Sequence, residues 1–204
     1  MRHHSTQIVR TRNSDKQQLV KQKAIERLGE HGFQGFSMNK LAAACGISVA
    51  TLYIYYKDKN DLIKTIGTQI GKQFMAKSLE GFSPKMSFAE GLKKQWENRT
   101  SFALQYPKEI ACYEIIRHSS EVEFMVEESF IEFKTIMGEF CQNAVKRKEL
   151  VPLSVDVFWS IAYGPLYTLL GFHQQGKSIG GKSFKFSKQK MEEAFQVVLK
   201  AFTP

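Results

Sequence analysis

Two short helical patterns joined through one glycine constrain the fold of this 204-residue chain more than any other feature. The apolar spacing of residues 38–45 predicts a first helix. Gly46 follows directly, at a position where glycine adopts the left-handed conformation without steric cost. Ser48 is a favourable N-cap residue and predicts a second helix over residues 49–56. Because helices joined by so short a turn cross steeply, the pattern predicts a helix-turn-helix.

A helix-turn-helix leaves the N-terminus of its second helix free to enter the major groove of DNA. The distribution of charge supports this interpretation. Residues 1–72 hold 12 Lys and Arg against 5 Asp and Glu, whereas residues 73–204 hold 17 against 15. The net charge of +9 is therefore concentrated around the motif, where counterion release from phosphate favours binding. A solvated basic face is the alternative explanation.

The residues in and around the motif follow a known order and spacing. They are Gly32, Phe33, Ser37, Leu41, Ala42, Cys45, Gly46, Ile47, Ser48, Ala50, Leu52, Tyr53, Tyr55, Tyr56, Lys59 and Leu62. In this register they resemble the TetR family of bacterial transcriptional regulators. Cys45 stands where that family usually has alanine, and Ala50 where it usually has glycine. Both residues are small, so close packing is expected to survive, while Ala50 alters the surface that faces the groove.

The resemblance implies an all-α fold with two domains. Residues 1–60 would form a three-helix DNA-binding domain, and residues 61–204 a larger effector-binding and dimerisation domain. Helical periodicity agrees with this fold class. It predicts helices over residues 14–30, 61–79, 87–105, 107–119, 121–148, 156–173 and 187–202, after a polar, basic arm in residues 1–13. Two glycines in the 61–79 helix, Gly67 and Gly71, indicate close packing in preference to a pliable connector.

The resemblance assigns DNA contacts to nine residues. Two belong to the first motif helix: Ser37 is expected to cap it, and Asn39 to lie near the groove edge. The start of the second helix is expected to face bases or backbone through Ser48, Val49, Ala50 and Thr51. Phosphates are expected to be held by Tyr53, Tyr55 and Lys59. Phosphate contacts of this kind position the helix without reading the base sequence.

Apolar stripes in the last two helices have two explanations. From periodicity alone, a stripe of this kind is ordinarily core. In the resembled family the corresponding helices pair with their copies in a second subunit, which makes a homodimer interface our preferred interpretation. The residues expected there are Phe158, Leu166, Leu170, Phe195, Val198 and Phe202. A dimer also meets a physical need, because one recognition helix reads few base pairs and a two-fold dimer doubles them.

The middle of the chain is rich in aromatic and methionine residues. Without the resemblance we would interpret them as a packed core. With it, they predict a pocket for a small hydrophobic effector, to which His118 or Gln95 would add a polar group. The residues expected to line the pocket are Trp96, Phe102, Tyr106, Tyr113, Phe133, Met137 and Tyr163.

Other functional classes find little support in the sequence. No catalytic motif is present, no metal-ligand spacing occurs among the three cysteines, and we expect no catalytic residue, metal or cofactor. No apolar run approaches the ~20 residues of a membrane span, and the unpaired cysteines suit a reducing cytoplasm. The resemblance to the TetR family therefore implies a repressor that binds a palindromic operator in double-stranded DNA and is released by its effector. The alternatives are an activator or ligand-independent DNA binder and, more remotely, a helical enzyme or carrier.

Overall fold

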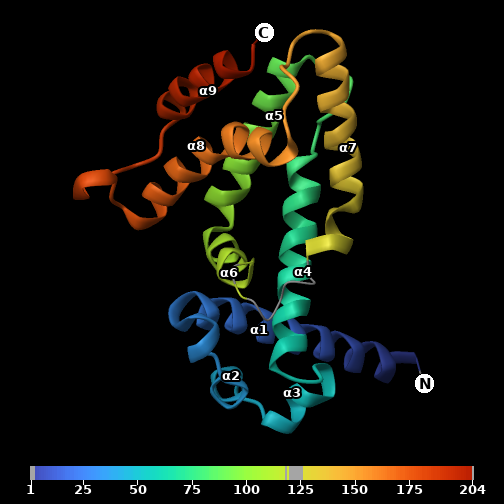
Figure 1. Cartoon of the computed structure of the whole chain (residues 1–204). Coiled ribbons are helices and arrows are strands. Elements are labelled where there is room, and N and C mark those ends of the chain that lie inside the picture. Colours follow the sequence, from blue (N-terminus) through green and yellow to red (C-terminus); the bar gives the residue numbers. More distant parts are fainter. Residues whose placement is uncertain (1–2, 118, 120–125, 204) are drawn as a thin grey trace. The chain divides into compact units, whose positions relative to one another are not determined.

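The computed structural model describes residues 3–117, 119 and 126–203, and the side chains of residues 15–116, 119 and 131–203. Within that part the regular secondary structure is helical, apart from an isolated bridge between Lys177 and Ser183. A short 3-10 helix, η2, spans Ile179–Gly181. The α-helices are α1 (His3–Gly35), α2 (Met38–Cys45), α3 (Val49–Tyr55), α4 (Lys59–Ser78), α5 (Phe88–Gln105), α6 (Pro107–Arg117), α7 (Val126–Lys146), α8 (Val155–Gln175) and α9 (Lys188–Phe202), as Figure 1 shows. The all-α prediction is confirmed.

The chain divides into two compact units. Unit 1 comprises Met1–Lys72 and Lys108–Ser129, and unit 2 comprises Gln73–Pro107 and Phe130–Pro204. Helix α4 is continuous through the division, so its residues up to Lys72 belong to unit 1 and those from Gln73 to unit 2. The predicted domain boundary after residue 60 stays a prediction, because compact packing and independent folding are different properties.

Helix α1 is longer than the sequence predicted. It begins at His3, so the polar, basic arm expected before the first helix, over residues 1–13, is itself helical from His3 onward. The physical reason is that residues 3–13 contain neither glycine nor proline, and nothing breaks the helix before Gly29. Near the other end, Gly32 adopts φ 65° and interrupts the helical geometry.

Unit 1 includes residues of α4 and α6 as well as the motif helices α2 and α3. The backbone of Gly71 lies so near the Tyr113 ring that an added methyl group would sit 3.3 Å from its Cε2 atom. This favours the close-packing explanation at Gly71. An ion pair of 3.1 Å between Lys108 Nζ and Glu26 Oε1 joins α6 to α1.

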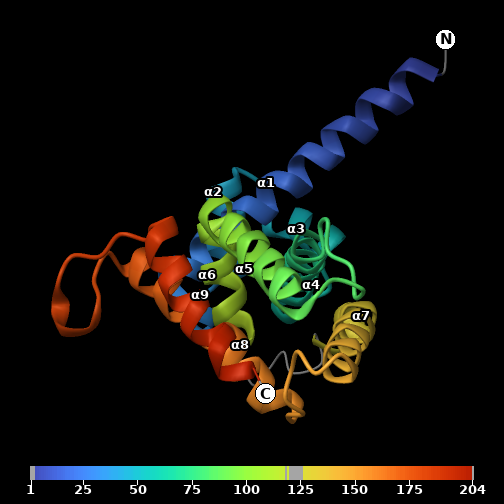
Figure 2. The same cartoon turned by 90° about the horizontal axis from the view of Figure 1, so that it is seen from above.

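Unit 2 is built on α5 and α8. The Trp96 indole nitrogen in α5 donates a 2.7 Å hydrogen bond to the Ala162 carbonyl oxygen in α8, and α8 also packs on α9 (Figure 2). The Phe88 ring stacks on Phe140 with centroids 5.9 Å apart. A methyl group at Gly91 would overlap that Phe140 ring, so α5 and α7 approach each other only because residue 91 has no side chain.

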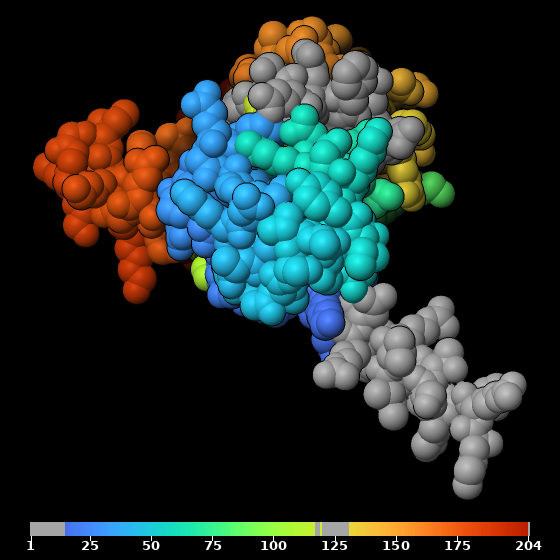
Figure 3. All heavy atoms as spheres, turned by 90° about the horizontal axis from the view of Figure 1, so that it is seen from below, coloured from blue at the N-terminus to red at the C-terminus, as the bar shows by residue number. Residues whose placement is uncertain are grey.

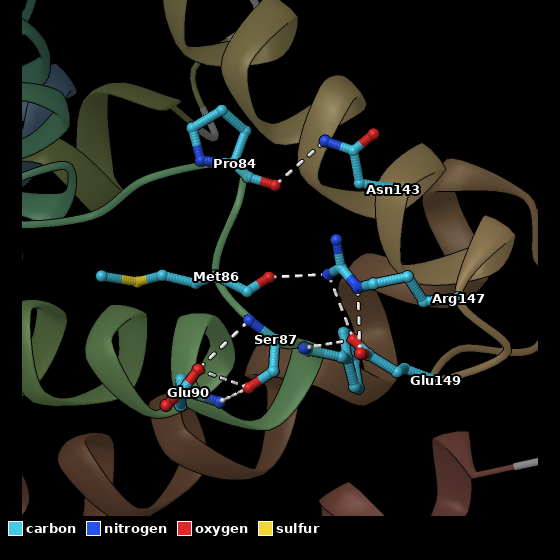
Figure 4. Close-up of polar contacts among 8 residues, drawn as sticks. Pro84, Met86, Ser87, Glu90, Asn143, Arg147 and Glu149 are labelled. Carbon is cyan, nitrogen blue, oxygen red and sulfur yellow. Dashed lines mark hydrogen bonds and ion pairs between the residues drawn. The ribbon is translucent and has the colours of Figure 1, made fainter.

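A polar clasp, which we define as Ser87, Glu90, Arg147 and Glu149, fixes the start of α5 against the end of α7 (Figure 4). Ser87 and Glu90 form a capping box, in which each side chain accepts a hydrogen bond from the other residue's backbone N–H. The Glu149 carboxylate accepts from the Phe88 N–H at 2.8 Å and pairs with Arg147 at 2.9 Å. Arg147 in turn donates to the Met86 carbonyl oxygen at 2.7 Å.

All three cysteines are free thiols. Cys45 and Cys112 are buried, and Cys141 is half-buried. Burial raises the pKa of Cys112 to about 12 and that of Cys141 to about 11, and it also raises the pKa of Cys45.

Candidate functional site

The turn between α2 and α3 has the geometry that the sequence predicted. Gly46 adopts φ 64° and ψ 31°. Its N–H donates to the Ala43 carbonyl, and the Ile47 N–H donates to the Ala42 carbonyl, both at 3.1 Å. These two bonds form a Schellman motif, which satisfies carbonyls that the helix end leaves open. The turn therefore fixes the direction in which α3 leaves α2.

The two motif helices are capped differently. Ser48 accepts a 3.1 Å hydrogen bond from the Thr51 N–H, and the hydroxyls of Ser48 and Thr51 lie 2.8 Å apart. Ser37 occupies the N-cap position of α2 with extended backbone, but its side chain makes no capping bond. Ser37 is thus at the capping position that was expected of it, without a side-chain bond.

Helix α3 buries one face and exposes the other. Leu52 is fully buried. With 3.6 residues per turn, the residues two before and two after it project to the opposite side. These are Ala50, which is exposed, and Ile54, whose side chain is 77% exposed. Figure 3 shows this side of unit 1, over which residues of α2 and α3 gather.

Ile54 is a residue that the sequence reasoning missed. A large apolar side chain so exposed on a seven-residue helix is unusual for a residue with only a packing role. The spacing of four residues from Ala50 was the available signal, since residues i and i+4 lie on one helix face. Beside them, Tyr53 is 52% exposed, Asn39 is exposed, and Val49 and Tyr55 are half-buried.

Lys59 has partners within unit 1. Its ammonium donates a 2.7 Å hydrogen bond to the Phe33 carbonyl oxygen and lies 4.3 Å from the centroid of the Phe33 ring. The start of α4 is thereby tied to the end of α1. The phosphate contact expected of Lys59 stays a prediction, whereas the neighbouring Lys57 side chain is exposed.

The set of seven residues expected to line an effector pocket stays a prediction. Tyr113 belongs to unit 1, where it packs on Gly71. The other six belong to unit 2. Trp96 packs edge-on against Phe195, and Phe102 against Phe74 and Tyr106. Met137 is buried. His118 lies outside the described residues.

Phe133 and Tyr163 do come together, around a residue that the sequence reasoning missed. Arg99 in α5 has a relative exposure of 0%. Its guanidinium carbon lies between 4.1 and 6.0 Å from the centroids of the rings of Phe74, Phe133, Trp159, Tyr163 and Tyr167. The signal was present in the sequence, because Arg99 stands among the apolar residues Trp96, Phe102 and Ala103 on the buried stripe of α5.

The predicted dimer residues require a correction. Phe158, Leu166, Leu170, Phe195, Val198 and Phe202 are all at most 7% exposed in a single chain. They pack inside unit 2, as in the contacts of Phe158 and Phe88 with Phe202. The stripe that periodicity identified is therefore core, and these side chains are not available to a second subunit.

Both helices carry a second stripe that is more exposed. In α8 it consists of Val157, Ile161, Gly164 and Thr168, and in α9 of Ala194, Val197 and Ala201. Val157 is 44% and Val197 67% exposed. Most of these residues are small or apolar, which suits close approach of another helix.

Neither a membrane-spanning helix nor a group of metal ligands is found among the described residues. No helix among them is long and apolar enough to cross a membrane. In the same part of the chain, no three His, Cys, Asp or Glu side chains are grouped as metal ligands.

Comparison with known proteins agrees with this geometry. Residues 22–66 match the model of the bacterial regulatory proteins of the tetR family. A protein of Haemophilus influenzae Rd, described as an uncharacterised HTH-type transcriptional regulator, is 26% identical over 148 residues, which is 68% of this chain and 73% of that protein.

Two crystal structures have a similar fold. A TetR family transcription regulator from Marinobacter aquaeolei VT8 has a TM-score of 0.76 and 27% identity over 95% of this chain and 98% of that one. A TetR-family transcriptional regulator from Haemophilus influenzae Rd has a TM-score of 0.71 and 19% identity over 94% of this chain and 98% of that one. The similarity thus extends over both units.

Proposed function

Since the chain belongs to the TetR family of bacterial transcriptional regulators, we propose that it is a cytoplasmic repressor that binds a palindromic operator as a homodimer. A small hydrophobic effector releases it from the DNA. The observation that carries the proposal is the exposed outer face of α3, held at a fixed angle by the Gly46 turn. Such a face fits the major groove, where base edges and thymine methyl groups can be read.

Base contacts come from the first turns of α3. Ala50 and Ile54 occupy its outermost positions and suit thymine methyl groups, with Val49 and Thr51 beside them. The Ser48 and Thr51 hydroxyls lie 2.8 Å apart at the N-terminus of α3. Since a helix N-terminus attracts phosphate, the proposal gives both hydroxyls a phosphate contact.

Phosphate contacts surround this face. Tyr53 and Lys57 are exposed and belong to α3 and the loop after it. Ser37, Asn39 and Tyr55 complete the surface, and Lys59 supports it from within by fixing α4 to Phe33. Contacts of this kind position the protein on the duplex and make its affinity depend on salt.

The dimer forms through the exposed stripes of α8 and α9 in place of the buried ones. Gly164, Ala194 and Ala201 allow helix backbones to approach closely, while Val157, Ile161 and Val197 supply apolar contact. A two-fold dimer of this kind presents two copies of α3, which the length and symmetry of an operator require.

The effector binds in unit 2, whose interior is rich in aromatic rings. Release follows if bound effector shifts α4, because α4 carries residues of both units. A coupling free energy of about 1–3 kcal/mol between effector and operator is sufficient. Linkage is reciprocal, so the operator must weaken effector binding by the same factor.

Sequencing the genomic fragments that the purified protein retains tests this function. We expect a palindrome among them, bound by a dimer far more tightly than random DNA of the same length at several salt concentrations. The variant Ile54→Ala should change the preferred bases, by about 1–3 kcal/mol for each altered contact. Equal affinity for palindrome and random DNA would contradict operator recognition. A reporter whose expression rises when the protein is present would identify an activator.

A further inference from the structure

Arg99 carries a charge in a fully buried position. A guanidinium remains protonated in proteins. Its Nε donates a 3.2 Å hydrogen bond to Gln95 Oε1, and its Nη1 donates to the Tyr167 hydroxyl. The third nitrogen, Nη2, is buried and makes no hydrogen bond. One of the three guanidinium nitrogens therefore has no hydrogen-bond acceptor.

The charge also lacks an anion. Among the described residues, no Asp or Glu forms an ion pair with Arg99. The five surrounding rings stabilise a cation through their π faces, yet burial of an ion without an opposite charge remains strongly unfavourable. A purely structural role would be served by methionine or leucine, which would fill the same space without that cost. The arrangement is therefore suited to a negatively charged group from outside the chain.

A second unsatisfied donor lies beside the first. The Tyr163 ring is the one nearest to the guanidinium, with its centroid 4.1 Å from Arg99 Cζ. Its hydroxyl is also buried and makes no hydrogen bond of ordinary geometry, and the Arg99 guanidinium is close enough to act on its pKa. Burial raises the pKa of Tyr163, so this hydroxyl stays protonated and can donate. Nη2 and the Tyr163 hydroxyl thus offer two donors to one acceptor group.

We propose that Arg99 and Tyr163 bind the carboxylate of the effector, whose remaining part is apolar. The inference rests on the proposed effector-binding function and gives its ligand a chemical class. One guanidinium balances one negative charge, so a carboxylate fits better than a phosphate dianion, which would leave a second charge buried among the rings. The aromatic walls exclude a polar body for the rest of the molecule.

The residues around Arg99 indicate where the ligand enters and in which direction its apolar part extends. We call the five rings around Arg99 the cage. Tyr167, the cage residue that hydrogen bonds to the guanidinium, is 37% exposed, so the cage reaches the surface there. An incoming carboxylate can replace the Tyr167 hydroxyl on Nη1 when that ring moves outward. A small pocket lies at the C-terminal ends of α5 and α8, lined by Ala103, Leu104, Pro107, Leu170, His173 and Gln174. Its members Ala103 and Leu170 follow Arg99 and Tyr167 by about one helical turn, so in the proposal the apolar part of the ligand extends along this side of the two helices.

Calorimetry on the full-length protein without DNA tests the inference. The probes are straight-chain carboxylates of about six to fourteen carbons, each compared with the primary alcohol of equal length. We expect at least one acid to bind about tenfold or more tightly than its alcohol, because only the acid supplies the missing charge. Arg99→Met should remove that difference, and Tyr163→Phe should reduce it by several-fold.

The matched control is Lys94→Met, which removes a positive charge from the same helix without touching the cage. It should bind like the wild type. Acids that bind no better than alcohols, or not at all, would overturn the proposal, and so would an Arg99→Met protein with unchanged selectivity. If Arg99→Met does not fold, Tyr163→Phe decides alone, since it removes only an unpaired hydroxyl.

A separate arm measures operator affinity with and without the bound acid. An acid that binds through Arg99 without changing operator affinity would leave the site intact and contradict the effector role. Release of the operator by the alcohols alone would support an effector and contradict the carboxylate site.

Discussion

At the scale of single residues, the two lysines that follow the end of α3, by two and by four positions, have different surroundings. Lys57 is exposed, whereas the Lys59 ammonium bonds to the Phe33 carbonyl. We expect Lys57→Met to weaken binding to all DNA and to reduce the log–log salt slope by about 1, with an unchanged melting temperature. Lys59→Met should instead lower the melting temperature, because the carbonyl loses its donor. Fluorescence anisotropy at several salt concentrations and thermal unfolding measure both. The opposite pattern would restore the phosphate contact expected of Lys59.

Among the described glycines other than Gly67, Gly91 has the least room for an added methyl group. A methyl group there would overlap the Phe140 ring and lie 3.1 Å from the Phe82 ring. Overpacking of this kind costs about 1–3 kcal/mol, so Gly91→Ala should lower the free energy of unfolding in urea by that amount. Gly138→Ala in α7 is the matched control, because no atom lies within 4 Å of its added methyl group. The control should be neutral or more stable, by up to about 1 kcal/mol. A Gly91→Ala protein as stable as the control would contradict the close contact with Phe140.

At the scale of helices, the polar clasp predicts a dependence of stability on pH. Its Arg147 hydrogen bonds, and less so the bond from the Phe88 N–H, hold the pKa of Glu149 below its ordinary value of 4.5. A carboxyl group with a lowered folded-state pKa stabilises the fold above its unfolded-state pKa. That contribution is lost as the pH falls through the folded-state value. Glu149→Gln should therefore be less stable than the wild type at pH 7, and the difference should shrink below about pH 4.

Urea unfolding at several pH values measures this dependence. Glu97→Gln is a suitable control, since Glu97 is an exposed carboxylate on α5, the helix to which Glu149 bonds, and lies outside the clasp. A Glu149→Gln deficit that is equal at pH 7 and pH 3 would show that the carboxylate charge contributes nothing.

The helices were predictable where local chemistry decides their ends. Gly46, Ser48 and Pro107 mark boundaries that the structure places within about a residue of those expected. The buried face of α8 and α9 was not predictable in the same way. Each helix carries two stripes with apolar members, and periodicity cannot say which one packs inside the chain. Arg99 was missed because a single charge hardly disturbs an apolar pattern, and only the fold surrounds it with rings.

At the scale of the whole molecule, the buried and the exposed stripe of α9 predict different effects of a charge placed at neighbouring residues. A charge on the exposed stripe should affect assembly, and a charge on the buried stripe should affect folding. Val197→Asp places a charge on the exposed stripe of α9 and should yield a folded monomer with weak operator binding. Phe195→Asp places the same charge in the core and should unfold the protein. Sedimentation velocity and circular dichroism distinguish these outcomes. Gln196→Asp, exposed but outside the stripe, should remain a folded dimer. A Val197→Asp variant that stays dimeric would move the interface to another surface.

The burial of the three thiols has a consequence for labelling chemistry. Thiolates, not thiols, react with disulfide reagents and maleimides, and the raised pKa values of Cys45, Cys112 and Cys141 leave little thiolate at neutral pH. We expect the native protein to react with a chromogenic disulfide at pH 7 far more slowly than the urea-unfolded chain, which should titrate three thiols. Rapid reaction of the folded protein would contradict this. In the variant Ala50→Cys, the exposed sulfur at position 50 would then be the only readily labelled one in each chain. In the proposed dimer, a single dye pair would report the separation of the two copies of α3.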